Sequence, residues 1–154
     1  MVTDEYGRTS DPDIFAIGDV ARRPVAGHHG LVRLESIPAA TEHARHAVTA
    51  ILGQDPEEPE VPWFWSDQFD LKLKIAGLTT PDARVVTRAT PGKNAVSYFH
   101  LEPAGNVVAV EAINAPADFN AGKKLIRRGA PVDPTALADP TVKMRDLTGR
   151  AERR

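Results

Sequence analysis

The chain has 154 residues, of which 42% are hydrophobic, and a formal net charge of −2, values that are ordinary for a globular protein and argue against overall disorder. No apolar run approaches the roughly 20 residues of a membrane span, and no basic-then-apolar leader opens the sequence, so we expect a soluble protein with no membrane partner. The absence of cysteine excludes a disulfide scaffold, a thiolate metal site and an iron–sulfur cluster held by this chain, and it fits a cytoplasmic location.

The charge is unevenly distributed along the chain. Residues 1–62 hold 5 basic against 11 acidic side chains, whereas 63–154 hold 14 against 10. This asymmetry favours two structural units, although a chance distribution over a solvated surface explains it as well. A net charge of −2 leaves no broad basic surface, so we expect no nucleic-acid partner.

The first predicted elements lead to an acidic residue at the end of a strand. A turn at 4–7 separates two short extended pieces, as in a hairpin. After a break at 11–13, the apolar run 14–17 predicts a short buried strand that stops at Gly18 and Asp19. Because open α/β sheets bind ligands at the carboxyl ends of their strands, Asp19 is a candidate ligand contact.

A helix is predicted next, after a polar loop at 22–33. Ser36 suits the N-cap because its hydroxyl can accept from a first-turn amide, Pro38 suits the first turn, and Gly53 ends the helix. Six apolar residues at three- and four-residue steps predict its buried face: Ile37, Ala40, Ala44, Ala47, Val48 and Ile51.

The rest of the chain predicts an antiparallel sheet with a packed helix. Residues 54–62, with three prolines and four acidic residues, form an expected linker. Five strand-like runs follow, with turn residues between them: 63–67, 71–77, 84–88, 95–101 and 107–113. A helix over 116–128 carries Phe119, Leu125 and Ile126 as its apolar residues and stops at Gly129, and 130–154 is expected to be irregular.

The predicted fold class is therefore α+β. A five-stranded antiparallel sheet with a packed helix is preceded by a strand–loop–helix remnant of an α/β domain. The predicted boundaries are 1–53 for the incomplete α/β domain, 54–62 for the linker, 63–147 for the sheet domain and 148–154 for a tail.

One string carries more information than its composition. Residues 9–20 read Thr-Ser-Asp-Pro-Asp-Ile-Phe-Ala-Ile-Gly-Asp-Val. Gly18 permits close approach of a ligand to the backbone, and the carboxylate of Asp19 can accept a hydrogen bond from a sugar-like hydroxyl. Strand–Gly–Asp alone is also a common structural turn. The whole string resembles the second flavin-binding signature of the flavoprotein reductases with two dinucleotide-binding domains. That resemblance implies that Asp19 holds the ribityl chain of FAD, with Gly18 and Val20 beside it.

A second, longer match covers nearly the whole chain, about 2 to 147. Its residues are Val-Arg-Leu-Glu-Ser-Ile-Pro-Ala-Ala at 32–40, Glu-His-Ala-Arg at 42–45 and Pro-Trp-Phe-Trp-Ser-Asp-Gln at 62–68. Together they resemble the ferredoxin, rubredoxin and putidaredoxin reductases of oxygenase systems. The resemblance implies that the helix beginning at Ser36 and Ile37 points its N-terminus at the flavin ring, and that Trp65 lies beside the flavin. Core packing remains the alternative for Ile37 and for both Trp63 and Trp65.

The remaining candidate residues for a metal or catalytic site have simpler structural explanations. His43 and His46 lie one helical turn apart beside Glu42, but no third metal ligand is implied, and we assign them to the polar face of the helix and expect no metal. No arrangement indicates acyl transfer, and no catalytic residue is expected. The basic helix end at 123–128 is either solvated or a docking site for an acidic ferredoxin.

The resemblance implies a parent enzyme that passes electrons from NAD(P)H through FAD to a ferredoxin or rubredoxin. The chain has no G-x-G-x-x-G, so it carries no phosphate-binding turn for FAD or NAD(P)H. We therefore expect an artificial start, an internal initiation or a truncated gene product at Met1, and an isolated chain that is inactive and binds FAD weakly or not at all. The alternatives are a non-catalytic binding or oligomerisation module, with self-association through the exposed half-domain, and part of an NADH oxidase or of a flavoprotein similar to apoptosis-inducing factor.

Overall fold

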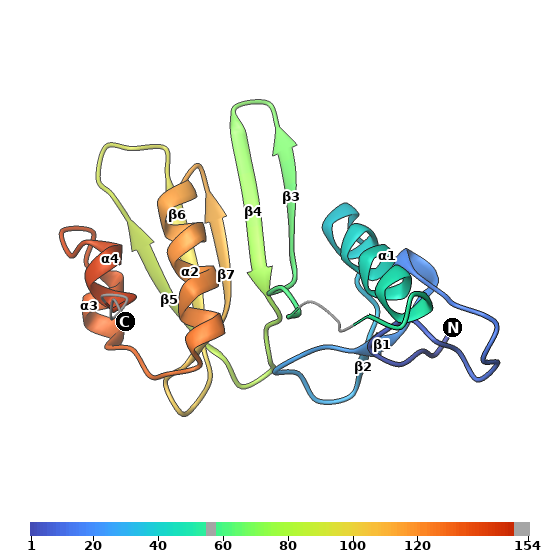
Figure 1. Cartoon of the computed structure of the whole chain (residues 1–154). Helices are drawn as coiled ribbons and strands as arrows, with labels where there is room; N and C mark the ends of the chain where they lie inside the picture. The colour runs from blue at the N-terminus through green and yellow to red at the C-terminus, as the bar shows by residue number, and fades with distance from the viewer. Residues whose placement is uncertain (55–57, 150–154) are drawn as a thin grey trace. The chain divides into compact units, whose positions relative to one another are not determined.

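The computed structural model describes residues 1–54 and 58–149. The chain divides into two compact units, Met1–Phe64 and Trp65–Arg154, and each is described by itself (Figure 1). The charge asymmetry of the sequence follows nearly the same division.

The first unit consists of short paired segments and one long helix. Its elements are the 3₁₀ turn η1 (Gly18–Val20), the antiparallel pair β1 (Arg23–Pro24) and β2 (Leu31–Val32), and the helix α1 (Ile37–Ile51). The predicted turn at 4–7 is present, since the Gly7 N–H donates to the Asp4 carbonyl at 3.2 Å.

The predicted buried strand at 14–17 is wrong. Phe15 makes only an isolated bridge to Arg8, and Ile14 and Ile17 are 47% and 41% exposed. A strand requires a continuous neighbour for its N–H and C=O groups, and this segment meets its neighbour only around that bridge. An apolar run is therefore insufficient to form a strand here.

Helix α1 begins and ends where the sequence predicts. Ser36 has extended backbone angles and its hydroxyl accepts from the Ala39 N–H at 3.3 Å, while Gly53 follows the last turn with a φ of +64°. The predicted buried face is wrong except for Ala47. The buried residues are Ala39, His43, His46 and Ala47, whereas three predicted core residues are more than half exposed: Ile37, Val48 and Ile51.

The second unit contains the predicted five-stranded antiparallel sheet. The strands are β3 (Trp63–Gln68), β4 (Leu71–Gly77), β5 (Arg84–Ala89), β6 (Val96–Leu101) and β7 (Val107–Ile113), in the order β3-β4-β7-β6-β5. β3 starts in the first unit and continues into the second. Each predicted strand is present within one residue of its predicted bounds. The expected α+β fold is thus confirmed.

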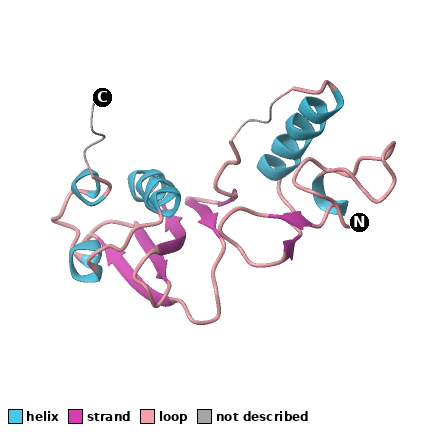
Figure 2. Ribbon diagram, turned by 60° about the horizontal axis from the view of Figure 1, so that its bottom comes forward, coloured by secondary structure: helices cyan, strands magenta, loops and turns pink. Residues whose placement is uncertain are grey.

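Helix α2 (Pro116–Arg128) packs on one face of this sheet, against β4 and β7. Figure 2 shows the sheet and the helix from below. Phe119 and Leu125 are buried as predicted. Gly122 is buried as well, and a Cβ atom at this position would lie 2.4 Å from Cγ1 of Val110. The missing side chain at Gly122 therefore permits the close approach of α2 to β7.

The segment after α2 is more ordered than the sequence predicts. It contains α3 (Pro134–Ala138) and α4 (Met144–Leu147). The buried guanidinium of Arg88 holds this segment, because it donates to the carbonyls of Leu137 at 3.1 Å and Val142 at 2.7 Å. The charged end of the sequence, 150–154, lies outside the described residues. Within 1–54 and 58–149, no helix combines the length and the apolar character needed to cross a membrane.

Candidate functional site

The Gly18–Val20 turn presents an exposed carboxylate. Gly18 has a φ of +65°, a left-handed conformation that glycine adopts without strain, and the Ala21 N–H donates to the Gly18 carbonyl at 3.0 Å. Asp19 is exposed. Among the residues that the structure describes, its carboxylate forms no hydrogen bond and no ion pair. A ligand hydroxyl or amine can therefore bind there without displacing a protein partner.

His43 of α1 holds this turn through a hydrogen bond to its backbone. Its Nδ1 accepts the Gly18 N–H at 3.1 Å, and the side chain is only 2% exposed. Burial, aided by the charge of Arg23 and by His46, lowers the pKa of His43 to about 4. The imidazole is therefore neutral at pH 7, with Nδ1 as the acceptor. Its proton is assigned to Nε2 on this hydrogen bond.

A second buried histidine is part of a polar core in the same unit. The Arg23 side chain, 5% exposed, places Nη2 3.1 Å from Nδ1 of His46 and also donates to the carbonyl of Glu5. Burial lowers the pKa of Arg23, against the opposing effect of nearby carboxylates such as Glu42. The assignment of His43 and His46 to the polar helix face is therefore wrong. Both histidines fill the core because Gly18 and Arg23 supply their hydrogen-bond partners.

The start of α1 adjoins the Gly18–Val20 turn. A Cβ atom at Gly18 would lie 3.5 Å from the Cβ of Ala40, in the first turns of the helix. Ser36 Oγ accepts from the helix and donates to the Trp63 carbonyl at 3.4 Å, and Ile37 is 70% exposed. The structure thus brings together the turn that carries Asp19 and the helix end predicted at Ser36 and Ile37.

The other predicted flavin contact lies in the second unit. Trp65 is on β3 and 41% exposed. Its side chain is therefore accessible on its own unit. The expectation that it lies beside the flavin remains a prediction.

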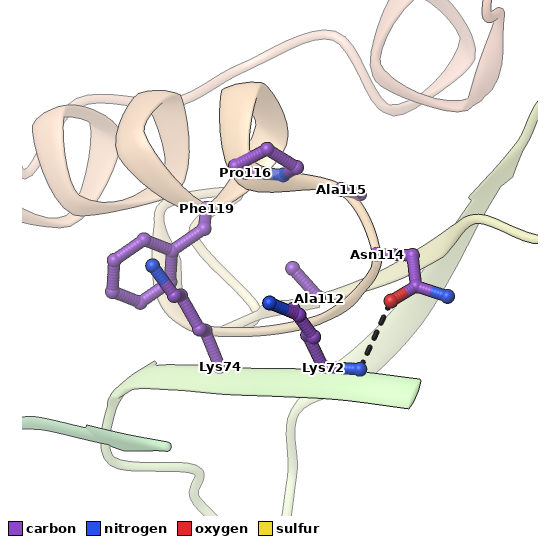
Figure 3. A pocket seen from close by; sticks show the side chains of 7 residues that line it. All are labelled: Lys72, Lys74, Ala112, Asn114, Ala115, Pro116 and Phe119. Carbon is purple, nitrogen blue, oxygen red and sulfur yellow. Dashed lines mark hydrogen bonds between the residues drawn. The ribbon is translucent and has the colours of Figure 1, made fainter. Parts of the chain in front are cut away.

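The second unit also has a pocket that the sequence did not indicate. A volume of about 210 Å³ opens between the start of α2 and strands β4 and β7 (Figure 3). Its lining residues are Lys72, Lys74, Ala112, Asn114, Ala115, Pro116 and Phe119. The only sequence signal for this pocket is the spacing of Lys72 and Lys74, because residues i and i+2 of a strand share a face. What these lysines face depends on the position of α2.

The two units match two family models. Residues 63–148 match the model described as reductase C-terminal, and residues 1–46 match the model described as pyridine nucleotide-disulphide oxidoreductase. The probable ferredoxin reductase CtmF of Castellaniella defragrans is 44% identical over 148 residues, which are 96% of this chain and 36% of that protein. Putidaredoxin reductase CamA of Pseudomonas putida is 36% identical over 99% of this chain and 36% of its own length. The chain thus spans about a third of the length of these curated relatives.

Solved structures agree with these sequence matches. The covalent complex of putidaredoxin reductase with putidaredoxin has a TM-score of 0.89 at 36% identity, covering 99% of this chain and 36% of that one. The ferredoxin reductase for the CYP199A2 system from Rhodopseudomonas palustris has a TM-score of 0.84 at 35% identity, covering 97% and 37% of the two chains. The resemblance noted in the sequence is confirmed, and the chain belongs to the reductase C-terminal family, in which its relatives are ferredoxin and putidaredoxin reductases.

Proposed function

We propose that this chain is the part of a flavoprotein reductase that completes the flavin site and meets the electron acceptor. The proposed activity of the whole protein is electron transfer from NADH or NADPH through FAD to a ferredoxin or rubredoxin-type acceptor. Support comes from both family models and from relatives named as ferredoxin reductases. The proposed division is 1–53 for the end of the FAD-binding domain, 54–62 for a linker, 63–147 for the interface domain and 148–154 for a tail.

The exposed carboxylate of Asp19 is the observation that carries this proposal. The Gly18–His43 hydrogen bond fixes the backbone from which Asp19 projects, at 3.1 Å between Gly18 N and His43 Nδ1. Within the described part of the chain, the carboxylate itself has no partner. A carboxylate accepts hydrogen bonds from hydroxyl groups, and the ribityl chain of FAD is a polyol. The residues present therefore fit this part of the cofactor.

The surroundings of Asp19 also fit the ring of the cofactor. Val20 is 51% exposed, so its side chain offers apolar contact area to a flat ring, and Ile37 is 70% exposed, so the start of α1 is accessible to a ligand. The N-terminus of α1 favours negative charge close to Ile37. We propose that Ile37 contacts the ring mainly through its backbone, and that Trp65 excludes water from the ring on the side of the acceptor. Bound FAD would supply the coupling of a two-electron hydride donor to one-electron acceptors.

A spectral titration of the purified chain with FAD tests the contribution of these residues alone. We expect a complex weaker than micromolar, because a glycine-rich turn that binds the diphosphate is absent from the 154 residues. A micromolar or tighter complex would contradict this expectation.

A chimera tests the function itself. In it, this chain replaces the matching 36% of the P. putida putidaredoxin reductase. We expect the chimera to retain FAD and to reduce a ferredoxin-type acceptor. Asp19→Ala should weaken FAD binding by roughly tenfold or more, the value of a lost hydrogen bond to a charged group. Asp13→Ala, which removes another exposed carboxylate, is the matched control. Equal FAD affinity of the Asp19 and Asp13 variants would exclude Asp19 as a flavin contact.

We also propose that the exposed apolar side chains of the first unit take part in self-association. Among those more than 40% exposed are Ile14, Ile17, Val20, Ile37, Val48, Ile51 and Leu52. Exposed apolar surface of this kind is typical of a face that is covered by another segment or another molecule.

A further inference from the structure

The pocket between α2 and strands β4 and β7 combines an apolar floor with two cationic side chains. Lys74 pairs with Ala112 across β4 and β7, and Ala76 pairs with Val110, so these residues share the sheet face that α2 covers. Lys72 lies two residues before Lys74 and therefore points to the same face. In Figure 3 the Lys72 and Lys74 side chains rise from β4 toward the start of α2.

These two lysines have no acidic partner in the described residues. Lys74 places its Nζ 5.5 Å from the centre of the Phe119 ring, a cation–π contact. Asp118, which follows Pro116 and Ala117 on α2, is engaged elsewhere, since it accepts from Ser97 Oγ at 2.9 Å and lies 3.5 Å from Nε of Arg88. Two like charges on neighbouring positions of one face repel each other, and an anion between them would relieve this repulsion.

The pocket is held in shape by a residue in a rare conformation. Asn114 has a φ of +51°, in the left-handed region where asparagine is tolerated better than most residues. Its Oδ1 accepts the Lys72 N–H at 2.9 Å, its own N–H donates to the Lys72 carbonyl at 3.0 Å, and its Nδ2 donates to the Asn94 carbonyl at 2.9 Å. This network fixes the end of β7 and the entry into α2. A ligand therefore meets a preformed site.

We propose that this pocket binds a small organic carboxylate with an aromatic or compact apolar body. The carboxylate lies between the ammonium groups of Lys72 and Lys74, and the apolar body packs on Ala112, Pro116 and Phe119. The volume of about 210 Å³ suits this size, since a cavity of about 150 Å³ is sufficient for benzene. Nothing in the proposal depends on flavin binding.

Benzoate is the probe for this proposal. In a titration of the ¹⁵N-labelled 154-residue chain, followed by two-dimensional NMR, benzoate should give saturable shifts of the Ala112, Asn114 and Phe119 amides. Benzamide has the same shape without the charge, and acetate has the charge without the ring. We expect each of them to bind at least fivefold more weakly than benzoate. Equal binding of benzamide or of acetate would overturn the proposal, as would shifts that map elsewhere.

Matched variants separate the site from general charge effects. The double variant Lys72→Gln/Lys74→Gln should lose about five- to tenfold in benzoate affinity, whereas Lys124→Gln, an exposed residue of α2 outside the pocket, should retain it. A thermal unfolding midpoint equal to that of the unchanged chain would show that the double variant is folded. An equal loss in the Lys124 variant would overturn the proposal. So would a titration in which only an acidic protein, and not benzoate, shifts the pocket residues.

Discussion

At the scale of single residues, the first unit depends on polar side chains that the sequence pattern assigns to the surface. His43 is the central example, because one imidazole nitrogen fixes the backbone turn from which Asp19 projects. Its lowered pKa of about 4, against 6.5 for a free histidine, is the electrostatic consequence of this burial. The conformation of the Gly18–Val20 turn therefore depends on the neutral form of the His43 imidazole.

This coupling predicts a pH dependence of stability. Between pH 6.5 and 4, the unfolded chain binds a proton at His43 that the folded chain excludes, so the free energy of unfolding should fall as the pH falls. The stabilising contribution is complete above pH 6.5 and is lost by pH 4, and it amounts to about 3 kcal/mol. Urea unfolding of the chain between pH 4 and 7 measures it.

Substitutions at His43 separate the charge from the hydrogen bond. His43→Asn keeps an acceptor for the Gly18 N–H and should retain slow amide exchange at Gly18, whereas His43→Leu should accelerate that exchange. Both His43 variants should remove the contribution of His43 to the pH dependence of the free energy of unfolding. His46→Asn, at the other buried histidine, is the control. A His43→Leu variant with unchanged Gly18 exchange would disprove the role of this hydrogen bond.

At the scale of elements, the packing of α2 on the sheet depends on the missing side chain at Gly122. A Cβ atom there would approach Cγ1 of Val110 to 2.4 Å, far inside contact distance. Gly122 is in the middle of α2, where alanine has a better helix propensity than glycine by about 1 kcal/mol. The close approach of α2 to β7 therefore outweighs the lower helix propensity of glycine at this position.

The prediction is that Gly122→Ala destabilises the chain by about 1–3 kcal/mol despite its helix propensity, because overpacking costs more than propensity supplies. Val110→Ala alone should also destabilise, by creating a cavity. The double variant Gly122→Ala/Val110→Ala should be more stable than the sum of the two single effects predicts. Denaturant unfolding of all four proteins measures this coupling, and strict additivity would contradict the steric explanation.

At the scale of the whole molecule, apolar surface is concentrated on the first unit. Val48 and Ile51 project from α1 and are 54% and 63% exposed. Light scattering at increasing protein concentration should therefore give a mass above the 16.7 kDa of a single chain. Val48→Lys/Ile51→Lys should lower this mass toward that of the monomer, whereas Thr41→Lys, exposed on the same helix, should leave it unchanged. A monomer at every concentration would contradict self-association.

The sequence by itself determined the sheet and helix α2 of the second unit, helix α1 of the first unit, and the family. Short strand-like runs separated by turn residues were sufficient to predict the sheet. An N-cap serine and a following glycine bounded α1, and a glycine stop ended α2. The strings at 9–20 and 62–68 are specific enough in residue order and spacing to identify the family by themselves.

Tertiary structure decided what lies inside the first unit and what the second unit offers to a ligand. Helical periodicity placed Ile37, Val48 and Ile51 in the core, but the protein buries His43 and His46 instead. Helical periodicity predicts burial from the spacing of apolar residues alone. It takes no account of the hydrogen-bond partners of His43 and His46, because Gly18 and Arg23 lie more than twenty residues away from them in the chain. The pocket at Lys72 and Lys74 could not be predicted from the alternation of the two lysines alone, because it exists only where α2 covers the sheet.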